Sequence, residues 1–363
     1  MQAQVEQPAF NMSNREGAMN ELCRVGGLRI RLNRTLTKLG VLCSAFALMG
    51  PVNGIAADYP SRPIRYTHAS AGGLADLMAR AFTDKLSQRT GQPAVVESRP
   101  GAGGLVSYQG CVSQSDGYTL CNASVTTFTL PYTLKAFKGS VEQDMILVAP
   151  LIVGRNVIVA HPSLPVKNMD ELLAYMRANP GKVNLSVNTQ FDHMQSIALQ
   201  NLTGVKFETI RYPGLAANQN ALVAGEVHVQ LTGQTAWTKS LAEGGRVRPL
   251  AVNGQARDKL FLPQVPALAE SSSPELKELA KSILFQPAWI GVAVGSKTPR
   301  PIVETLYAHA KEIVKDPEFI KRMRDVGWET LETLPTLAES AEMMRNGLAE
   351  FGRIAKQAGI EPQ

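Results

Sequence analysis

A glycine-rich run, Arg99-Pro100-Gly101-Ala102-Gly103-Gly104, carries the sharpest chemical signal in the sequence. It lies between a predicted strand and a predicted helix, where glycines let the backbone approach a ligand and direct several N–H groups at one point. The positive end of the helix dipole adds attraction for an anion. The run matches neither GxGxxG nor GxxxxGK[ST], which argues against a dinucleotide or P-loop site. A tight turn without a ligand is the alternative.

A second loop of the same design is Ser70-Ala71-Gly72-Gly73-Leu74-Ala75-Asp76. Asp76 falls in the first turn of the following helix, where the dipole stabilises a carboxylate and free N–H groups can donate to it. Asp76 either orders this loop or is an ordinary helix-start residue. His68, just upstream, either faces the same cleft or is structural.

Polar side chains follow several other predicted strands. Ser124 and Thr126 follow a strand in the first half of the chain, and Asn188-Thr189-Gln190 and Tyr212-Pro213-Gly214 follow two strands in the second half. Ligands bind at the carboxyl ends of strands in open α/β sheets. These residues would therefore supply neutral donors and an aromatic wall. For each hydroxyl, a plain surface role is the alternative.

Catalytic and metal-binding motifs are missing from the chain after residue 57. It contains no GxSxG, HExxH or CxxC motif, and its few histidines are scattered. An enzyme of the hydrolase type needs a nucleophile with a base and an orienting group. We expect no enzymatic activity, no metal and no cofactor, and keep a periplasmic α/β enzyme as a distant alternative.

The first 57 residues have the parts of a secretory signal. A basic region from Arg29 to Lys38 precedes an apolar stretch from Leu39 to Met49 and small residues ending at Ala57. The apolar stretch is too short to span a bilayer. We expect cleavage after Ala57 and export to the periplasm.

Part of the net charge and two of the four cysteines lie in this leader, and the remainder lie in the rest of the chain. The whole chain carries a net charge of +6, but six basic and three acidic residues lie in the leader. The remaining charge is mild and dispersed, which argues against a nucleic-acid partner. Cys23 and Cys43 also lie in the leader. Cys111 and Cys121 remain, either as a disulfide or as two buried free thiols.

Short apolar runs alternate with helical patterns along the rest of the chain. The rhythm predicts an α/β fold with a largely parallel sheet, in two blocks of similar style. The last helices have no strands of their own to cover, so we expect them to return to the first block. The predicted lobes are 58–159 with 286–363, and 160–285. Two crossings, near Ala160 and near Gln286, would form a hinge.

A set of ordered motifs resembles the substrate-binding proteins of tripartite tricarboxylate transporters, also called Bug receptors. The resemblance covers essentially the whole chain after the leader. The motifs are Tyr59-Pro60-Ser61-Arg62-Pro63-Ile64, Gly72-Gly73 with Asp76, Glu97-Ser98-Arg99-Pro100-Gly101-Ala102-Gly103-Gly104, Asp116-Gly117-Tyr118-Thr119-Leu120, His161-Pro162-Ser163-Leu164-Pro165-Val166-Lys167, Arg248-Pro249-Leu250-Ala251-Val252 and Leu262-Pro263-Gln264-Val265-Pro266.

The resemblance implies a type II periplasmic binding protein fold, with two α/β lobes joined by a two-crossing hinge. It also implies that backbone N–H groups of the two glycine loops hold a ligand carboxylate, without an ion-pairing arginine. The ligand-binding residues that it indicates are Gly72, Gly73, Asp76, Gly101, Ala102, Gly103, Gly104, Ser124, Thr126, Asn188, His193, Tyr212 and Gly214.

Several positions depart from the family pattern. Ser70 and Ala71 replace two prolines, Pro213-Gly214-Leu215 replaces Lys-Gly-Gly, and His228 and Thr232 lie on a strand that often carries acidic residues. The distal half of the pocket is therefore reshaped. We expect a monomeric receptor that delivers a small organic acid to the membrane subunits of such a transporter. A receptor that presents its ligand to a membrane sensor is the alternative.

Overall fold

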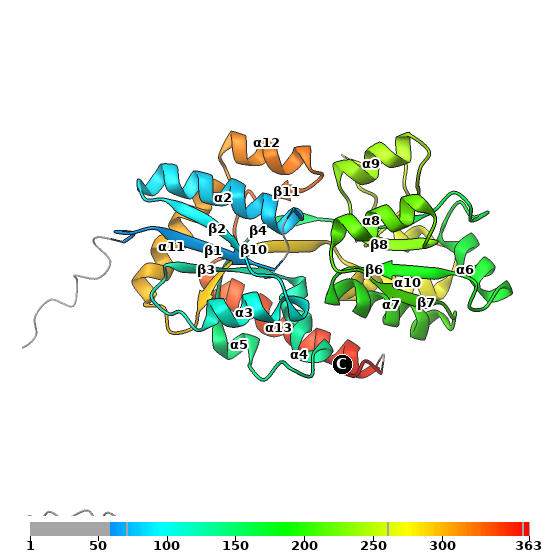
Figure 1. The fold of residues 1–363 in the computed structure, drawn as a ribbon, viewed down its shortest axis with the longest axis horizontal. Helices are drawn as coiled ribbons and strands as arrows, with labels where there is room; N and C mark the ends of the chain where they lie inside the picture. The colour runs from blue at the N-terminus through cyan, green and yellow to red at the C-terminus, as the bar shows by residue number, and fades with distance from the viewer. Residues whose placement is uncertain (1–58, 70–71, 260, 358, 363) are drawn as a thin grey trace, which may run out of the picture. The chain divides into compact units, whose positions relative to one another are not determined.

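The computed structural model describes residues 59–69, 72–259, 261–357 and 359–362. The predicted leader, its cleavage after Ala57, and Ser70 and Ala71 of the first glycine loop lie outside the described residues. The strands form two sheets, one of six strands and one of five. In Figure 1 the six-stranded sheet combines blue and cyan elements with orange ones, whereas the five-stranded sheet is drawn in green and yellow.

The six-stranded sheet takes strands from both ends of the described chain. Its order is β11-β4-β10-β3-β1-β2. These strands are β1 (Ile64–His68), β2 (Ala94–Ser98), β3 (Thr119–Ser124), β4 (Met145–Gly154), β10 (Ala288–Gly295) and β11 (Glu329–Thr330).

Helices cover both faces of this sheet (Figure 1). α2 contacts α11 and α12, while α13 contacts α4 and α5. The helical segments are α2 (Leu74–Thr90), η2 (Ala102–Gly104), α3 (Leu105–Val112), α4 (Val125–Thr133), α5 (Val141–Asp144), α11 (Arg300–Ile313), α12 (Pro317–Asp325) and α13 (Leu337–Gln357).

The five-stranded sheet has the order β7-β6-β8-β5-β9. Its strands are β5 (Asn156–Ala160), β6 (Asn184–Val187), β7 (Glu208–Arg211), β8 (Val229–Gly233) and β9 (Arg248–Val252). The helical segments of this part are α6 (Met169–Ala178), α7 (Gln190–Thr203), α8 (Leu215–Ala224), α9 (Ala236–Glu243), η3 (Leu268–Glu270), α10 (Pro274–Lys281) and η4 (Ile283–Phe285).

The prediction of a largely parallel sheet is wrong mainly for two strands, β5 and β10. β1, β2 and β3 are parallel, but β10 runs antiparallel to β3 and to β4. In the other sheet β6, β7 and β8 are parallel, and β5 runs antiparallel to β8 and β9. β5 and β10 are the strands at which the chain passes from one sheet to the other. Neither strand is joined to a neighbour in its own sheet by the βαβ crossover that makes neighbouring strands parallel.

The first crossing lies earlier than the predicted position near Ala160. β4 ends at Gly154 in one sheet, and β5 begins at Asn156 in the other. Arg155 alone therefore joins them. The return passes through α10 and η4 to β10, which begins at Ala288. Both strands are apolar and buried, so the sequence does not show that the chain changes sheet between them.

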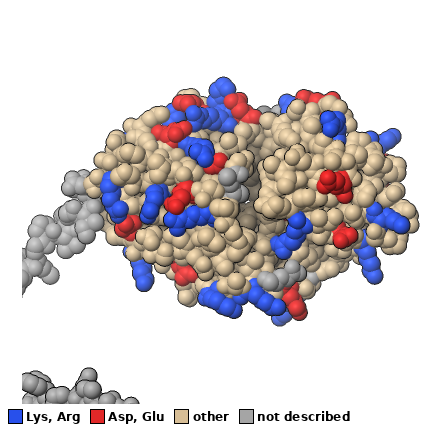
Figure 2. Space-filling view, in the orientation of Figure 1, with Lys and Arg blue, Asp and Glu red and all other residues tan. Residues whose placement is uncertain are grey.

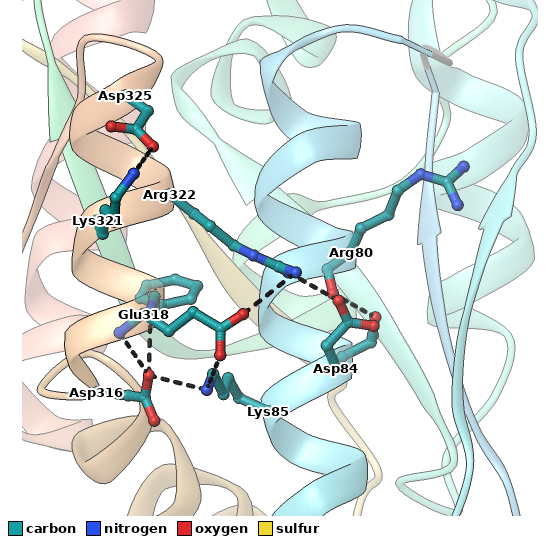
Figure 3. Close-up of polar contacts among 10 residues, drawn as sticks. Arg80, Asp84, Lys85, Asp316, Glu318, Lys321, Arg322 and Asp325 are labelled. Carbon is teal, nitrogen blue, oxygen red and sulfur yellow. Dashed lines mark hydrogen bonds and ion pairs between the residues drawn. The ribbon is translucent and has the colours of Figure 1, made fainter.

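Charged side chains connect the late helix α12 to the early helix α2 (Figure 3). Lys85 Nζ lies 2.7 Å from Glu318 Oε2 and 3.0 Å from Asp316 Oδ1. Arg322 Nη1 donates to Asp84 Oδ2 at 2.8 Å. The late helices thus return to the sheet that the first strands build.

Cys111 of α3 and Cys121 of β3 form a disulfide in the structure. Both residues are buried in the main apolar core. Of the two alternatives that the sequence leaves open, the structure has the bonded one. The bond ties the helix after the second glycine loop to the neighbouring strand.

Candidate functional site

A cavity of about 690 Å³ is lined by loops from both sheets. Its walls include the second glycine loop after β2 and the residues that follow β3, β6 and β7. The volume is within the range of small-molecule sites. Figure 2 shows a hollow in this face of the molecule, and Lys, Arg, Asp and Glu side chains are interspersed over the face around it.

Six helices begin at this cavity. The N-cap residues of α2, α3, α4, α7, α8 and α9 all line it, and they are Gly73, Gly104, Ser124, Thr189, Gly214 and Thr235. The first N–H groups of a helix have no partner within the helix, and its N-terminus carries a partial positive charge. Helix N-termini of this kind favour an anionic ligand.

The second glycine loop owes its shape to four consecutive positive φ angles. These are 132° at Gly101, 44° at Ala102, 65° at Gly103 and 103° at Gly104. Ala102 is the only non-glycine residue with a positive φ among the described residues. An L-residue in this region costs about 1–2 kcal/mol. All four residues line the cavity, so the strained backbone lies where a ligand would bind.

Asp76 orders the first glycine loop and does not line the cavity. Its Oδ2 accepts the Gly72 N–H at 3.0 Å, and its Oδ1 lies 3.0 Å from Nε2 of the fully buried His68. Arg80 donates to the same carboxylate. Burial alone would raise the pKa of Asp76, but the hydrogen bonds from Gly72 and Arg80 and the charges of His68 and Arg80 lower it below its ordinary value.

The first loop therefore differs from the prediction at two residues. Gly73 lines the cavity, whereas Gly72 and Asp76 are not among the lining residues. Gly72 has a φ of 71° and directs its N–H at Asp76 instead. In this structure the hydrogen bond between Gly72 and Asp76 lies next to Gly73, a residue of this loop that lines the cavity.

The predicted residues at the other strand ends lie together around the cavity. Ser124, Thr126, Asn188, Tyr212 and Gly214 all line it. Asn188 Oδ1 accepts from Asn218 Nδ2 at 3.0 Å, which leaves the Asn188 amide N–H groups as donors for a ligand. The buried Thr232 hydroxyl also lines the cavity and has no hydrogen-bond partner among the described residues.

His193 does not line the cavity. It lies in the first turn of α7, where its backbone N–H donates to the Thr189 carbonyl. Burial, and to a smaller extent the charge of Arg211, lower the pKa of His193 to about 4. The imidazole is therefore neutral near pH 7 and is not a cationic anchor for an anion.

Sequence reasoning missed Arg211, the one Lys or Arg side chain among the described residues that line the cavity. It is the last residue of β7 and directly precedes the predicted Tyr212. Its Nη2 donates to Gln190 Oε1 at 2.5 Å. The signal was its place at a strand end, which is the criterion that had selected Tyr212.

Neither a metal-ligand cluster nor a helix that could span a membrane is found in the described part of the chain. That part contains no group of three or more His, Cys, Asp or Glu side chains placed to hold a metal ion. Within the same residues, no helix is both long enough and apolar enough to cross a bilayer.

Comparison with known proteins gives a consistent result. Residues 78–360 match the model of the tripartite tricarboxylate transporter family receptor. A protein of the UPF0065 group from Bordetella bronchiseptica is 30% identical over 348 residues, which are 93% of this chain and 97% of that protein. Protein BugT of Bordetella pertussis is 28% identical over 92% of this chain and 99% of its own.

A solved structure supports the same assignment. The periplasmic binding protein BugD is 26% identical and superposes with a TM-score of 0.75 over 84% of this chain and all of BugD. The predicted type II periplasmic binding protein fold is therefore confirmed. The chain belongs to the tripartite tricarboxylate transporter receptor family, the Bug receptors.

Proposed function

We propose that this protein is a non-catalytic receptor that binds a small organic anion, a carboxylate, in the cavity between its two sheets. The observation that carries the proposal is the set of six helix N-termini around one cavity, with Arg211 as a further positive group. Charge-assisted hydrogen bonds to a carboxylate contribute roughly 1.5–3 kcal/mol each. Two or three of them supply much of a micromolar affinity, about 8 kcal/mol.

Membership in the family supports the further proposal that the bound acid is delivered to the membrane subunits of a tripartite tricarboxylate-type transporter. On this proposal the two sheets act as lobes that close on the ligand around Arg155 and the segment before β10. The protein would be exported as a monomer to the periplasm after cleavage behind Ala57.

The test has two parts. Native mass spectrometry of the protein purified from its periplasm should show a bound organic acid. A thermal-shift screen of carboxylic acids should then raise the melting temperature with the same acid. Binding of neutral sugars or of cations in place of acids would contradict the proposal.

A further inference from the structure

The cavity wall has two charged side chains among the described lining residues, Asp192 and Arg211. The Asp192 carboxylate is buried and accepts the Thr189 N–H, so it serves the start of α7. The Arg211 side chain is exposed. Within the described part of the chain, no carboxylate forms an ion pair with it. The guanidinium is therefore a positive charge at the cavity whose hydrogen-bond partner is a neutral amide.

Gln190 provides that amide and also contacts the second glycine loop. Its Oε1 accepts from Arg211 Nη2 at 2.5 Å. Its Nε2 lies so close to Gly103 that a Cβ added there would be 2.6 Å away. Gly103 belongs to the loop after β2 and Arg211 to the end of β7, in the other sheet. Gln190 thus spans the cavity between the two walls and fixes the direction of the guanidinium.

The two walls differ in the kind of donor that they offer. The glycine loop offers main-chain N–H groups, which suit one carboxylate. Arg211 offers a planar fork of charged donors, which suits a second carboxylate in bidentate geometry. Since Gln190 occupies one guanidinium nitrogen, the remaining donors are left for the ligand.

We propose that Arg211 is a specificity-determining residue that pairs with a second acidic group of the ligand, so that the receptor prefers a dianion to a monoanion of equal length. Gln190 is the positioning residue that holds the guanidinium toward the cavity. This inference rests on the proposed function, because it assumes that a first carboxylate is bound at the helix N-termini.

The experiment compares matched pairs of probes by isothermal titration calorimetry. The probes are the linear dicarboxylates from malonate to suberate and the monoamide of each, which keeps the length and removes one charge. For the wild-type protein we expect the best dicarboxylate to bind about 10- to 100-fold more tightly than its monoamide, as expected for one charged hydrogen-bonded group.

Two variants remove this preference by different routes. Arg211→Gln should reduce the ratio of the dicarboxylate affinity to the monoamide affinity to near one. The monoamide affinity itself should stay within about threefold of the wild-type value, since only the contact with the second carboxylate is lost. Gln190→Glu should act similarly, because it places a carboxylate against the intact guanidinium. Lys206→Gln is the matched control: it removes one exposed charge just before the same strand, outside the cavity lining, and should keep the ratio.

The outcomes separate this inference from the proposed function. If dicarboxylates and monoamides bind equally to the wild type, or Arg211→Gln keeps the preference, Arg211 does not select the dianion, and the anion receptor stands. If the thermal-shift screen finds a monocarboxylate that binds and no dicarboxylate does, this inference fails and the anion receptor stands. If no carboxylic acid binds at all, the proposed function fails, and this inference fails with it.

Discussion

At the scale of single residues, the most informative side chain is Asp76, which acts on the site without lining it. Asp76→Ala removes the acceptor of the Gly72 N–H and leaves the buried His68 without its carboxylate. We expect a loss of about 1–3 kcal/mol in the free energy of unfolding, measured by urea denaturation, and weaker ligand binding. Asp84→Ala, in the same helix but in an exposed pair with Arg322, should cost less than about 1 kcal/mol and leave binding unchanged. Equal effects of the two variants would refute the loop-ordering role.

Gly103 is a residue where backbone and side-chain effects can be separated. Its φ is 65°, and an added Cβ would meet Gln190 at 2.6 Å. Gly91 has a φ of 68° with nothing within 4 Å of its added Cβ. Both alanine variants should lose about 1–2 kcal/mol through backbone strain. Gly103→Ala should lose more stability than Gly91→Ala, because its added Cβ also collides with Gln190. Combining Gln190→Ala with Gly103→Ala should restore this additional loss. Urea denaturation of the wild type, the three single variants and the double variant of Gly103 and Gln190 is the measurement, and an unchanged extra loss in the double variant would contradict the contact.

Asp192 gives a pH dependence of stability. Burial raises its pKa to about 6, although hydrogen bonds from Thr189 and Asn188 offset part of the shift. An unfolded Asp has a pKa of about 3.9, so the folded protein binds this proton more tightly than the unfolded chain does. The contribution of Asp192 to the free energy of unfolding is therefore greatest below about pH 4. It falls as the pH rises to about 6 and stays constant at higher pH, and the total change is about 3 kcal/mol.

This pH dependence is measured as the difference in unfolding free energy between the wild type and a variant without the titrating group. Asp192→Asn keeps the shape of the side chain and removes its titration. The unfolding free energy of the wild type relative to Asp192→Asn should decline between about pH 4 and 6. A difference that is flat across this range would show that the carboxylate is not perturbed.

At the scale of elements, the disulfide joins two elements that both lead to the cavity. Gly104 is the N-cap of α3 and Ser124 is the last residue of β3, and both of these residues line the cavity. The closed loop is short, so replacing Cys111 and Cys121 with alanine should cost about 2–3 kcal/mol. Alkylation of the denatured, non-reduced mature protein should modify no thiol. Two modified thiols in that assay would show that the bond is absent.

How well the sequence predicts an element depends on whether local preference and tertiary packing agree. Local preference and packing agree in α2 and in the final helix α13, whose sequences have long helical patterns. α4 was missed, because its sequence VTTFTLPYT is rich in β-branched residues and contains Pro131. Packing forms this helix: it contacts α13 and α7, and Phe128 stacks edge-on against Trp289.

α10 was missed for a different reason. Ser273 caps it and Pro274 occupies its first turn, but the run Ser271-Ser272-Ser273-Pro274 is equally typical of an irregular connection, so the sequence does not predict the helix. The glycine loops and the polar strand ends were predictable because strand–glycine–helix junctions are local. Arg211 also ends a strand, but only the assembled structure shows that it lines the cavity and donates to Gln190.

At the scale of the whole described chain, the fold brings residues far apart in the sequence to one site. The first glycine loop and β3 come early, α7 and β7 come from the middle, and Trp289 and Trp328 come from late segments of the chain. The contact of Phe191 in α7 with Phe351 in α13 further connects the two parts, with ring centroids 6.1 Å apart. Closure on a ligand must therefore preserve or replace such contacts.

The central claim is that the cavity binds an organic anion through its charge. Isothermal titration calorimetry of the wild-type protein tests it most directly, with the acid that gives the largest thermal shift and the fully amidated form of that acid. We predict that the acid binds at least about 10-fold more tightly, as expected for the loss of charged hydrogen bonds. An amide that binds as tightly as the acid would contradict the anion site described here.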